Sequence, residues 1–102
     1  MKLEVLKKQL KSTTPPVVID VRSGYEYRSG HIPGALHLPF PSLLFKRRSL
    51  PQDKKSLLVL TCEHGPRAVL AKKVFGLLGF KNCELLEGHM LAYRRKGLPL
   101  EK

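Results

Sequence analysis

The sequence contains no tryptophan, only two cysteines and few acidic residues. Cys62 and Cys83 lie far apart and form no C-x-x-C pair, so the sequence indicates neither a disulfide framework nor a zinc site. The four histidines show no i, i+4 pair of the kind that binds a metal. We therefore expect no metal site, and we interpret Cys83, at the start of an expected strand, as a structural residue.

Long apolar runs are also missing, and no stretch approaches the length of a membrane span. Charged residues fall within positions 1–8, where a signal peptide would need its apolar segment. With 102 residues, 42% of them hydrophobic and 26% charged, the chain has the composition of one soluble domain with a modest core. We expect a cytoplasmic protein that has no membrane partner.

The shortage of acidic residues leaves 19 basic against 8 acidic residues and a net charge of +11. Such a charge attracts anions, whether small oxyanions, acidic proteins or nucleic acid. The basic residues cluster at 46–48, 54–55, 72–73 and 94–96, on separate expected elements, and no cluster contains an aromatic residue. We interpret these clusters as solvated faces rather than as a nucleic-acid groove.

The residues that are present are organised around the stretch 57–67. A β-favouring run over 57–61 leads into a short loop, and helical spacing of apolar residues begins at Ala68. At the carboxyl end of a parallel strand, where a helix begins, backbone N–H groups lack partners and the helix dipole adds positive charge. The pattern therefore predicts a strand, an anion-binding loop and a helix.

Cys62 stands at the mouth of this expected loop, where N–H donors and Arg67 would favour its thiolate and make it a nucleophile. Gly65 gives the backbone freedom that a tight loop needs, and Pro66 suits the first helical turn. The alternative is a cysteine that is only a small buried hydrophobe. The polar neighbours of Cys62 favour the reactive interpretation.

Two of those neighbours, Glu63 and His64, raise their own questions. Glu63 would repel an anion in the loop, and we expect its carboxylate to point outward. His64 could favour the thiolate when it is protonated or could line the pocket, and we prefer the lining role because the loop already supplies a positive field.

Strands alternate with helices along the chain, which predicts an α/β protein with a parallel sheet covered on both faces. Asp20, inside a buried strand, needs a partner, and we prefer a structural role, in which it caps loop N–H groups or pairs with Arg22, to a catalytic role. Ser23 and Glu26 form a capping box at a helix start. We expect helices over residues 2–12, 24–30, 43–48, 68–78 and 90–96, and strands over 17–21, 35–38, 57–61 and 83–86.

Several motifs occur in the order typical of one family: Val18-Ile19-Asp20-Val21-Arg22, Glu26-Tyr27, Gly30-His31-Ile32-Pro33-Gly34-Ala35, Cys62-x-x-Gly65-x-Arg67, and Glu87-Gly88 with Gly97-Leu98-Pro99. On these residues the chain resembles a single-domain rhodanese, a sulfurtransferase. The resemblance implies a three-layer α/β/α fold with a small parallel sheet of four to five strands. It also implies one domain over 1–102, with an N-terminal helix and linker at 1–14 and a core at 17–99.

The resemblance further implies the chemistry. Cys62 would be the catalytic residue, taking a sulfane sulfur from a donor such as thiosulfate and passing it from a persulfide to a thiol or cyanide, with no metal or organic cofactor. The cradle for the persulfide would consist of Glu63, His64, Gly65, Pro66 and Arg67. The backbone N–H groups of this segment, to which Pro66 contributes none, would stabilise the sulfur, Arg67 would orient the anionic donor, and Asp20 and Arg22 would support the cradle. The spacing C-x4-R is one residue shorter than the C-x5-R of phosphatases and arsenate reductases that share the fold.

Two alternatives stay open. The chain could be a persulfide carrier or interaction module that is fed by an acidic sulfur-relay protein and acts little on small donors.

The family often has Gly-Gly where this chain has Gly88-His89, and tryptophan where it has Tyr93. His89 either approaches the loop or lies on the surface at a helix start.

Overall fold

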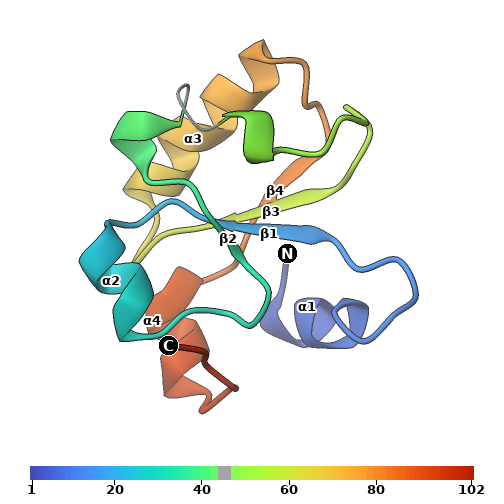
Figure 1. The fold of residues 1–102 in the computed structure, drawn as a ribbon. Helices are drawn as coiled ribbons and strands as arrows, with labels where there is room; N and C mark the ends of the chain where they lie inside the picture. The colour runs from blue at the N-terminus through green and yellow to red at the C-terminus, as the bar shows by residue number, and fades with distance from the viewer. Residues whose placement is uncertain (44–46) are drawn as a thin grey trace.

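A parallel four-stranded sheet with strand order β2-β1-β3-β4 forms the centre of the molecule in the computed structural model, which describes residues 1–43 and 47–102 (Figure 1). The strands are β1 (Val17–Asp20), β2 (Leu36–His37), β3 (Leu58–Thr61) and β4 (Cys83–Leu85). The helices are α1 (Leu3–Gln9), α2 (Gly24–Ser29), α3 (Pro66–Leu77) and α4 (His89–Arg95), with short 3-10 turns η1 (Phe40–Ser42) and η2 (Arg47–Ser49).

Both faces of the sheet are buried, because alternate residues of the two central strands β1 and β3 enter opposite hydrophobic clusters. On one face, Ile19 and Leu60 pack in a cluster that contains Phe75 of α3. On the other face, Val18 and Val59 pack in a cluster with residues of α1 and α4 (Figure 1). This arrangement gives the three layers α/β/α that the sequence predicts.

The strand order determines where the loops after β1 and β3 meet. The chain passes from β1 to β2 on one side and then returns to place β3 on the other side of β1. Asp20 pairs with Thr61 at the carboxyl ends of these two strands, and the N–H of Val21 donates to the carbonyl of Thr61 at 3.0 Å. Such a switch point is where open α/β sheets form their sites.

The expected elements agree with the structure to within one residue at each end, except for three helices. Helix α1 ends at Gln9 rather than at residue 12, because the N–H groups of Lys11 and Ser12 bond to carbonyls three residues back and tighten the chain. Helix α3 begins at Pro66 rather than at Ala68, since proline fits the first turn. Of the helix expected over 43–48, residues 44–46 lie outside the described residues, and Arg47–Ser49 form the turn η2.

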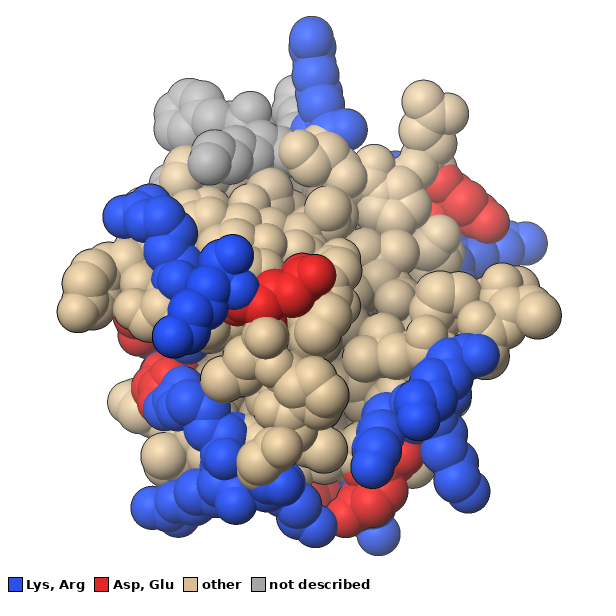
Figure 2. All heavy atoms as spheres, turned by 60° about the horizontal axis from the view of Figure 1, so that its bottom comes forward, with Lys and Arg blue, Asp and Glu red and all other residues tan. Residues whose placement is uncertain are grey.

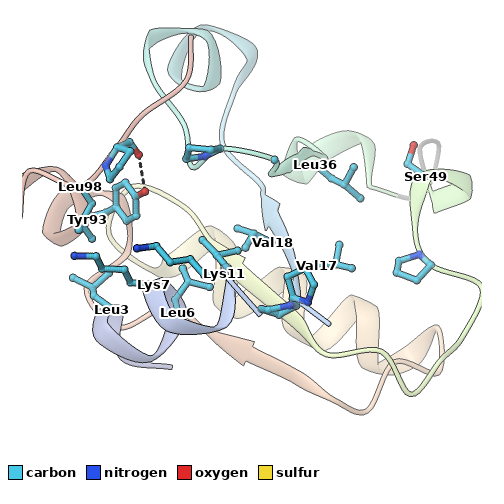
Figure 3. A pocket seen from close by; sticks show the side chains of 17 residues that line it. Leu3, Leu6, Lys7, Lys11, Val17, Val18, Leu36, Ser49, Tyr93 and Leu98 are labelled. Carbon is cyan, nitrogen blue, oxygen red and sulfur yellow. Dashed lines mark hydrogen bonds between the residues drawn. The ribbon is translucent and has the colours of Figure 1, made fainter. Parts of the chain in front are cut away.

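The surface is basic and carries one large apolar cleft. Figure 2 shows lysine and arginine side chains projecting at the periphery of one face, around residues of other kinds. The cleft, which we call the α1 groove, has a volume of about 740 Å³ and lies between α1, the start of β1 and the segments around 33–36, 49–51 and 93–99. Lys7 and Lys11 stand among its lining residues (Figure 3). Among the described residues, no helix is both long and apolar enough to cross a membrane.

The packing of α3 on the sheet predicts a large loss of stability for Phe75→Ala. Phe75 is fully buried and makes an edge-to-face contact with Phe80, with ring centroids 6.4 Å apart. We expect a loss of about 3–5 kcal/mol in the free energy of unfolding, because the cavity cannot refill. Leu77→Ala on the same helix is the control, since Leu77 is 89% exposed, and should change stability by less than about 0.5 kcal/mol. Urea unfolding measures both, and equal losses would contradict the packing.

Candidate active site

The loop from Cys62 to Arg67 joins β3 to α3, as the sequence predicts. The Sγ atom of Cys62 accepts a hydrogen bond from the N–H of Gly65 at 3.0 Å. Gly65 caps α3 with a φ of +133°, a conformation that residues with side chains rarely adopt, and Pro66 follows at the first helical position. The glycine and the proline therefore take the positions that the loop geometry requires.

The thiol of Cys62 is buried rather than exposed at the mouth of the loop. Cys62 has no exposed surface and belongs to the hydrophobic cluster on the α3 face. The loop turns back over the end of β3, so that the N–H of Gly65 covers the sulfur. A reactant therefore reaches Sγ only when the loop or its neighbours move. Cys83 is also a free, buried cysteine, and burial raises the pKa of its thiol.

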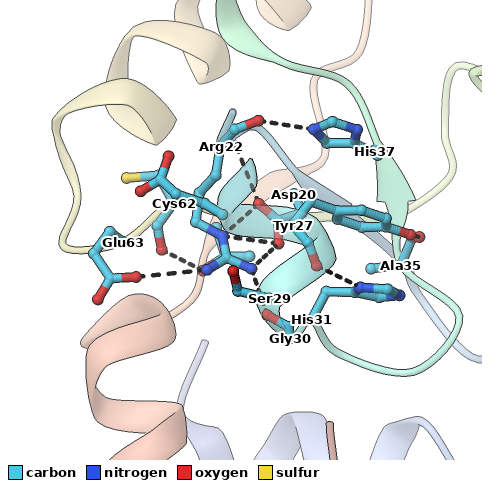
Figure 4. Close-up of polar contacts among 12 residues, drawn as sticks. Asp20, Arg22, Tyr27, Ser29, Gly30, His31, Ala35, His37, Cys62 and Glu63 are labelled. Carbon is cyan, nitrogen blue, oxygen red and sulfur yellow. Dashed lines mark hydrogen bonds and ion pairs between the residues drawn. The ribbon is translucent and has the colours of Figure 1, made fainter. Parts of the chain in front are cut away.

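Beside the loop lies a buried ion pair between Asp20 and Arg22 (Figure 4). The two side chains are 0% and 2% exposed, and Nη2 of Arg22 lies 2.7 Å from Oδ2 of Asp20. Nε of Arg22 also donates to both carboxylate oxygens, and Nη2 donates to the carbonyl of Gly30 at 2.8 Å. The structure thus contains the expected pair of Asp20 with Arg22, while its structural role stays a prediction.

Glu63 is partly exposed and is held by two arginines. Its carboxylate receives a two-pronged contact from Arg94 of α4 and lies 3.5 Å from Nη1 of Arg22. Hydrogen bonding from Arg94 holds the pKa of the Glu63 carboxyl below its usual value, against the effect of burial. The two guanidinium groups offset the repulsion that this carboxylate would exert on an anion in the loop.

Arg67, the last residue of the C-x4-R motif, is held by Glu26 of α2. Its Nη1 and Nη2 atoms donate to the two carboxylate oxygens at 2.6 Å and 2.9 Å. Glu26 also completes the capping box with Ser23, as predicted. The hydrogen bonds from Arg67, opposed by burial, lower the pKa of Glu26 to about 2. The guanidinium group is therefore already paired before any donor binds.

The start of α4 lies against the loop. The N–H groups of Met90 and Leu91 donate to the carbonyls of Cys62 and Glu63, each at 3.1 Å. His89 approaches the loop as well, with Nδ1 3.3 Å from the N–H nitrogen of Cys62. The open question about His89 is thereby answered in favour of the loop.

His64 is an exposed residue of the loop, and its role in lining the pocket stays a prediction. Arg94 was not recognised from the sequence, because it lies inside a basic cluster that gives no sign of its partner. Glu26 appeared in the sequence only as a helix cap and as part of a family motif. Among the described residues, no group of three His, Cys, Asp or Glu side chains gathers as a metal site would require.

The fold and the site together define an α/β domain with one cysteine in a loop at the start of a helix, at the switch point of a parallel sheet. The family profile described as Rhodanese-like domain matches residues 2–96. The chain therefore belongs to the rhodanese-like family.

Relatives and solved structures agree with this assignment. A protein of Allochromatium vinosum named sulfurtransferase is 30% identical over 97 residues, which cover 95% of this chain and 89% of the relative. A tRNA uridine(34) hydroxylase of Yersinia pestis is 34% identical over 94 residues, but this chain spans only 26% of its length. The crystal structure of a rhodanese-related protein from Thermoplasma volcanium is similar with a TM-score of 0.85 and 26% identity, covering 99% of this chain and 95% of that one.

The pair between Glu26 and Arg67 predicts a pH-dependent contribution to stability. Because the pKa of Glu26 is lowered from 4.5 to about 2, the contribution is fully present above pH 4.5 and is lost as the pH falls through about 2. Glu26→Gln still caps α2, so it isolates the charge, and we expect it to lose about 1 kcal/mol at pH 7 given the partial exposure of the pair. Urea unfolding at pH 7 and pH 2 should show the difference from the native chain disappear at the lower pH.

The matched control is Glu4→Gln, which removes the same charge from an exposed pair with Lys96. It should change stability less than Glu26→Gln at pH 7, because solvent screens an exposed ion pair. A Glu26→Gln chain as stable as the native one at pH 7 would contradict the role of this contact.

Proposed function

We propose that this chain is a rhodanese-type sulfurtransferase that carries the transferred sulfur on Cys62. The thiolate of Cys62 attacks the outer sulfur of thiosulfate, the S–S bond of the donor breaks, and sulfite leaves with the electron pair. A thiolate or cyanide then attacks the outer sulfur of the persulfide, and the Cys62 thiolate leaves. A compartment that keeps thiols reduced, such as the cytoplasm, suits this chemistry.

The observation that carries the proposal is the hydrogen bond from the N–H of Gly65 to Sγ of Cys62 at the beginning of α3. A backbone donor and the positive end of a helix both favour a negative charge on sulfur. The thiolate is the attacking species in the first step and the leaving group in the second, so both steps gain from the same donor. The relative named sulfurtransferase supports this assignment.

A mass measurement tests the proposal. After incubation with thiosulfate, the intact native chain should gain the mass of one sulfur atom, and a reductant such as dithiothreitol should remove it. Cys62→Ser should gain none, because it lacks the accepting thiol. Cys83→Ser is the matched control and should gain sulfur as the native chain does, because Cys83 lies at the opposite end of the sheet from the loop. Reductant-sensitive sulfur on Cys62→Ser would refute the proposal.

A second candidate function is favoured by the charges at the site. Each of the three guanidinium groups beside the loop is paired with a carboxylate, in the pairs Asp20–Arg22, Glu26–Arg67 and Glu63–Arg94. A small anionic donor therefore finds paired rather than free positive charges, and it finds the thiol enclosed. Both features suit a persulfide carrier that is loaded by a partner protein, which opens the loop as it docks.

The α1 groove offers a docking surface for such a partner. Its lining is mostly apolar, with Lys7 and Lys11 among it, so it fits an apolar segment flanked by carboxylates (Figure 3). The net charge of +11 would speed the encounter with an acidic partner. The acceptor or donor in this case is an acidic sulfur-relay protein.

The carrier function predicts that the double substitution Lys7→Gln and Lys11→Gln slows loading from an acidic persulfide-bearing protein about tenfold at low salt. Loading from thiosulfate should stay unchanged, because neither lysine lies near the 62–67 loop. The double substitution Lys72→Gln and Lys73→Gln, which removes the same charge from exposed positions on α3, is the control. Mass spectrometry of the loaded chain over time measures the rates, and equal slowing by both pairs would contradict docking at the groove.

A further inference from the structure

His89 has a backbone conformation that its side chain makes costly. Its φ is +52°, and it is the single non-glycine residue with positive φ among those described. Gly88 before it has a φ of +74°, and a β-carbon there would collide with that of Ala92. The chain therefore enters α4 through two left-handed residues, and only the first is a glycine. A strained residue persists where its surroundings hold it, and such residues gather at functional sites.

The contacts of the imidazole ring explain what holds it. The ring is buried, with 7% of the residue exposed, and Nδ1 accepts a hydrogen bond from the N–H of Cys62 at 3.3 Å. The hydroxyl of Thr61 lies 3.5 Å from the same nitrogen. On the other side of the ring, a β-carbon at Gly65 would lie 3.5 Å from Nε2. His89 thus stands between the backbone of the cysteine and the residue whose N–H binds the sulfur.

These contacts determine the protonation of the ring. The N–H of Cys62 is a donor, so Nδ1 must be free of a proton, and the neutral ring carries its proton on Nε2. Burial, with smaller contributions from His64 and the N-terminal ammonium of Met1, lowers the pKa of His89 below 6.5. The other polar group that contacts the ring is the hydroxyl of Thr61. Protonation of Nδ1 would set two donors against each other and break the contact.

We propose that His89 is a positioning residue for Cys62, holding the cysteine backbone through Nδ1 only while its ring is neutral. The inference rests on the proposed function, since it makes sulfur transfer depend on the protonation of a second residue. With the ring neutral, the Cys62 backbone is fixed and Sγ stays below the N–H of Gly65. With the ring charged, the N–H of Cys62 loses its acceptor on His89, and the loop loses its register on α4.

Three substitutions at position 89 distinguish the effects of the two ring nitrogens from the effect of the backbone strain. His89→Asn places an amide oxygen near the position of Nδ1 and tolerates the left-handed conformation, so it keeps the acceptor. His89→Gln places its terminal amide nearer the position of Nε2 and loses the acceptor. His89→Gly relieves the strain and removes the whole ring.

We expect His89→Asn to form the persulfide within about threefold of the native rate at pH 8, and His89→Gly and His89→Gln to be slower by about tenfold, as expected for loss of one buried hydrogen bond. The loss should appear in kcat rather than in KM for thiosulfate. The ratio of native to His89→Asn rates should be constant at and above neutral pH and should fall at acidic pH, where only the native chain can charge this ring. Urea unfolding of each variant establishes that it folds.

A second measurement separates failure of this inference from failure of the proposed function. The alkylation rate of Cys62 by iodoacetamide, and the imidazole resonances of His89 in long-range ¹H–¹⁵N spectra, need no sulfur donor. The same order of rates in alkylation and a proton on Nε2 would uphold the positioning role even if the chain took up no sulfur, in which case only the proposed function fails. A proton on Nδ1 at neutral pH, or native rates and an unchanged pH profile in folded His89→Gly, would overturn the inference.

Discussion

The buried ion pair between Asp20 and Arg22 is the contact on which the arrangement of the site depends. Removing two charges from water is costly, and such a pair is tolerable only when its remaining hydrogen bonds are satisfied. Here the carbonyl of Gly30 and the backbone N–H of Arg22 complete the set. The pair thereby joins the end of β1 to the end of α2. The guanidinium group of Arg22 also faces Glu63, and Glu63 in turn pairs with Arg94 of α4.

Two helix starts, rather than the loop residues alone, determine the geometry around Cys62. Helix α3 contributes the cap at Gly65, whose N–H meets the sulfur. Helix α4 contributes N–H groups that meet the carbonyls of Cys62 and Glu63. The loop is thus held by donors on both sides, and its chain path is closed tightly enough to bury the thiol. The position of the loop therefore depends on α4 as well as on α3.

Local patterns predicted the parts of the site that depend on residues close in sequence. The strand, loop and helix around 57–67 follow from apolar spacing together with Gly65 and Pro66, and the pair between Asp20 and Arg22 joins residues two positions apart. Contacts across long separations gave no such signal. Glu63 and Arg94 are 31 residues apart, so the sequence offered only a carboxylate beside an expected anion site and gave no sign of its arginine partner.

The burial of the thiol and the strain at His89 could not be read from the sequence for the same reason. Both depend on how closely α4 approaches the end of β3, which is a property of the packed layers. The shorter α1 reflects competition among local hydrogen bonds at its end, which the apolar pattern does not report. The sequence therefore predicts which residue types form the site, whereas the packing of the layers determines whether a reactant can reach the thiol.

The contact between Cys62 and His89 also bears on how the chain is made. The two residues are 27 positions apart, so the cysteine leaves the ribosome before the helix that closes over it. Until β4 and α4 have joined the sheet, the nascent loop has neither the donors for its carbonyls nor the acceptor for the cysteine N–H. The thiol is consequently open to oxidants and metal ions during synthesis, and it becomes protected only when the last helix docks.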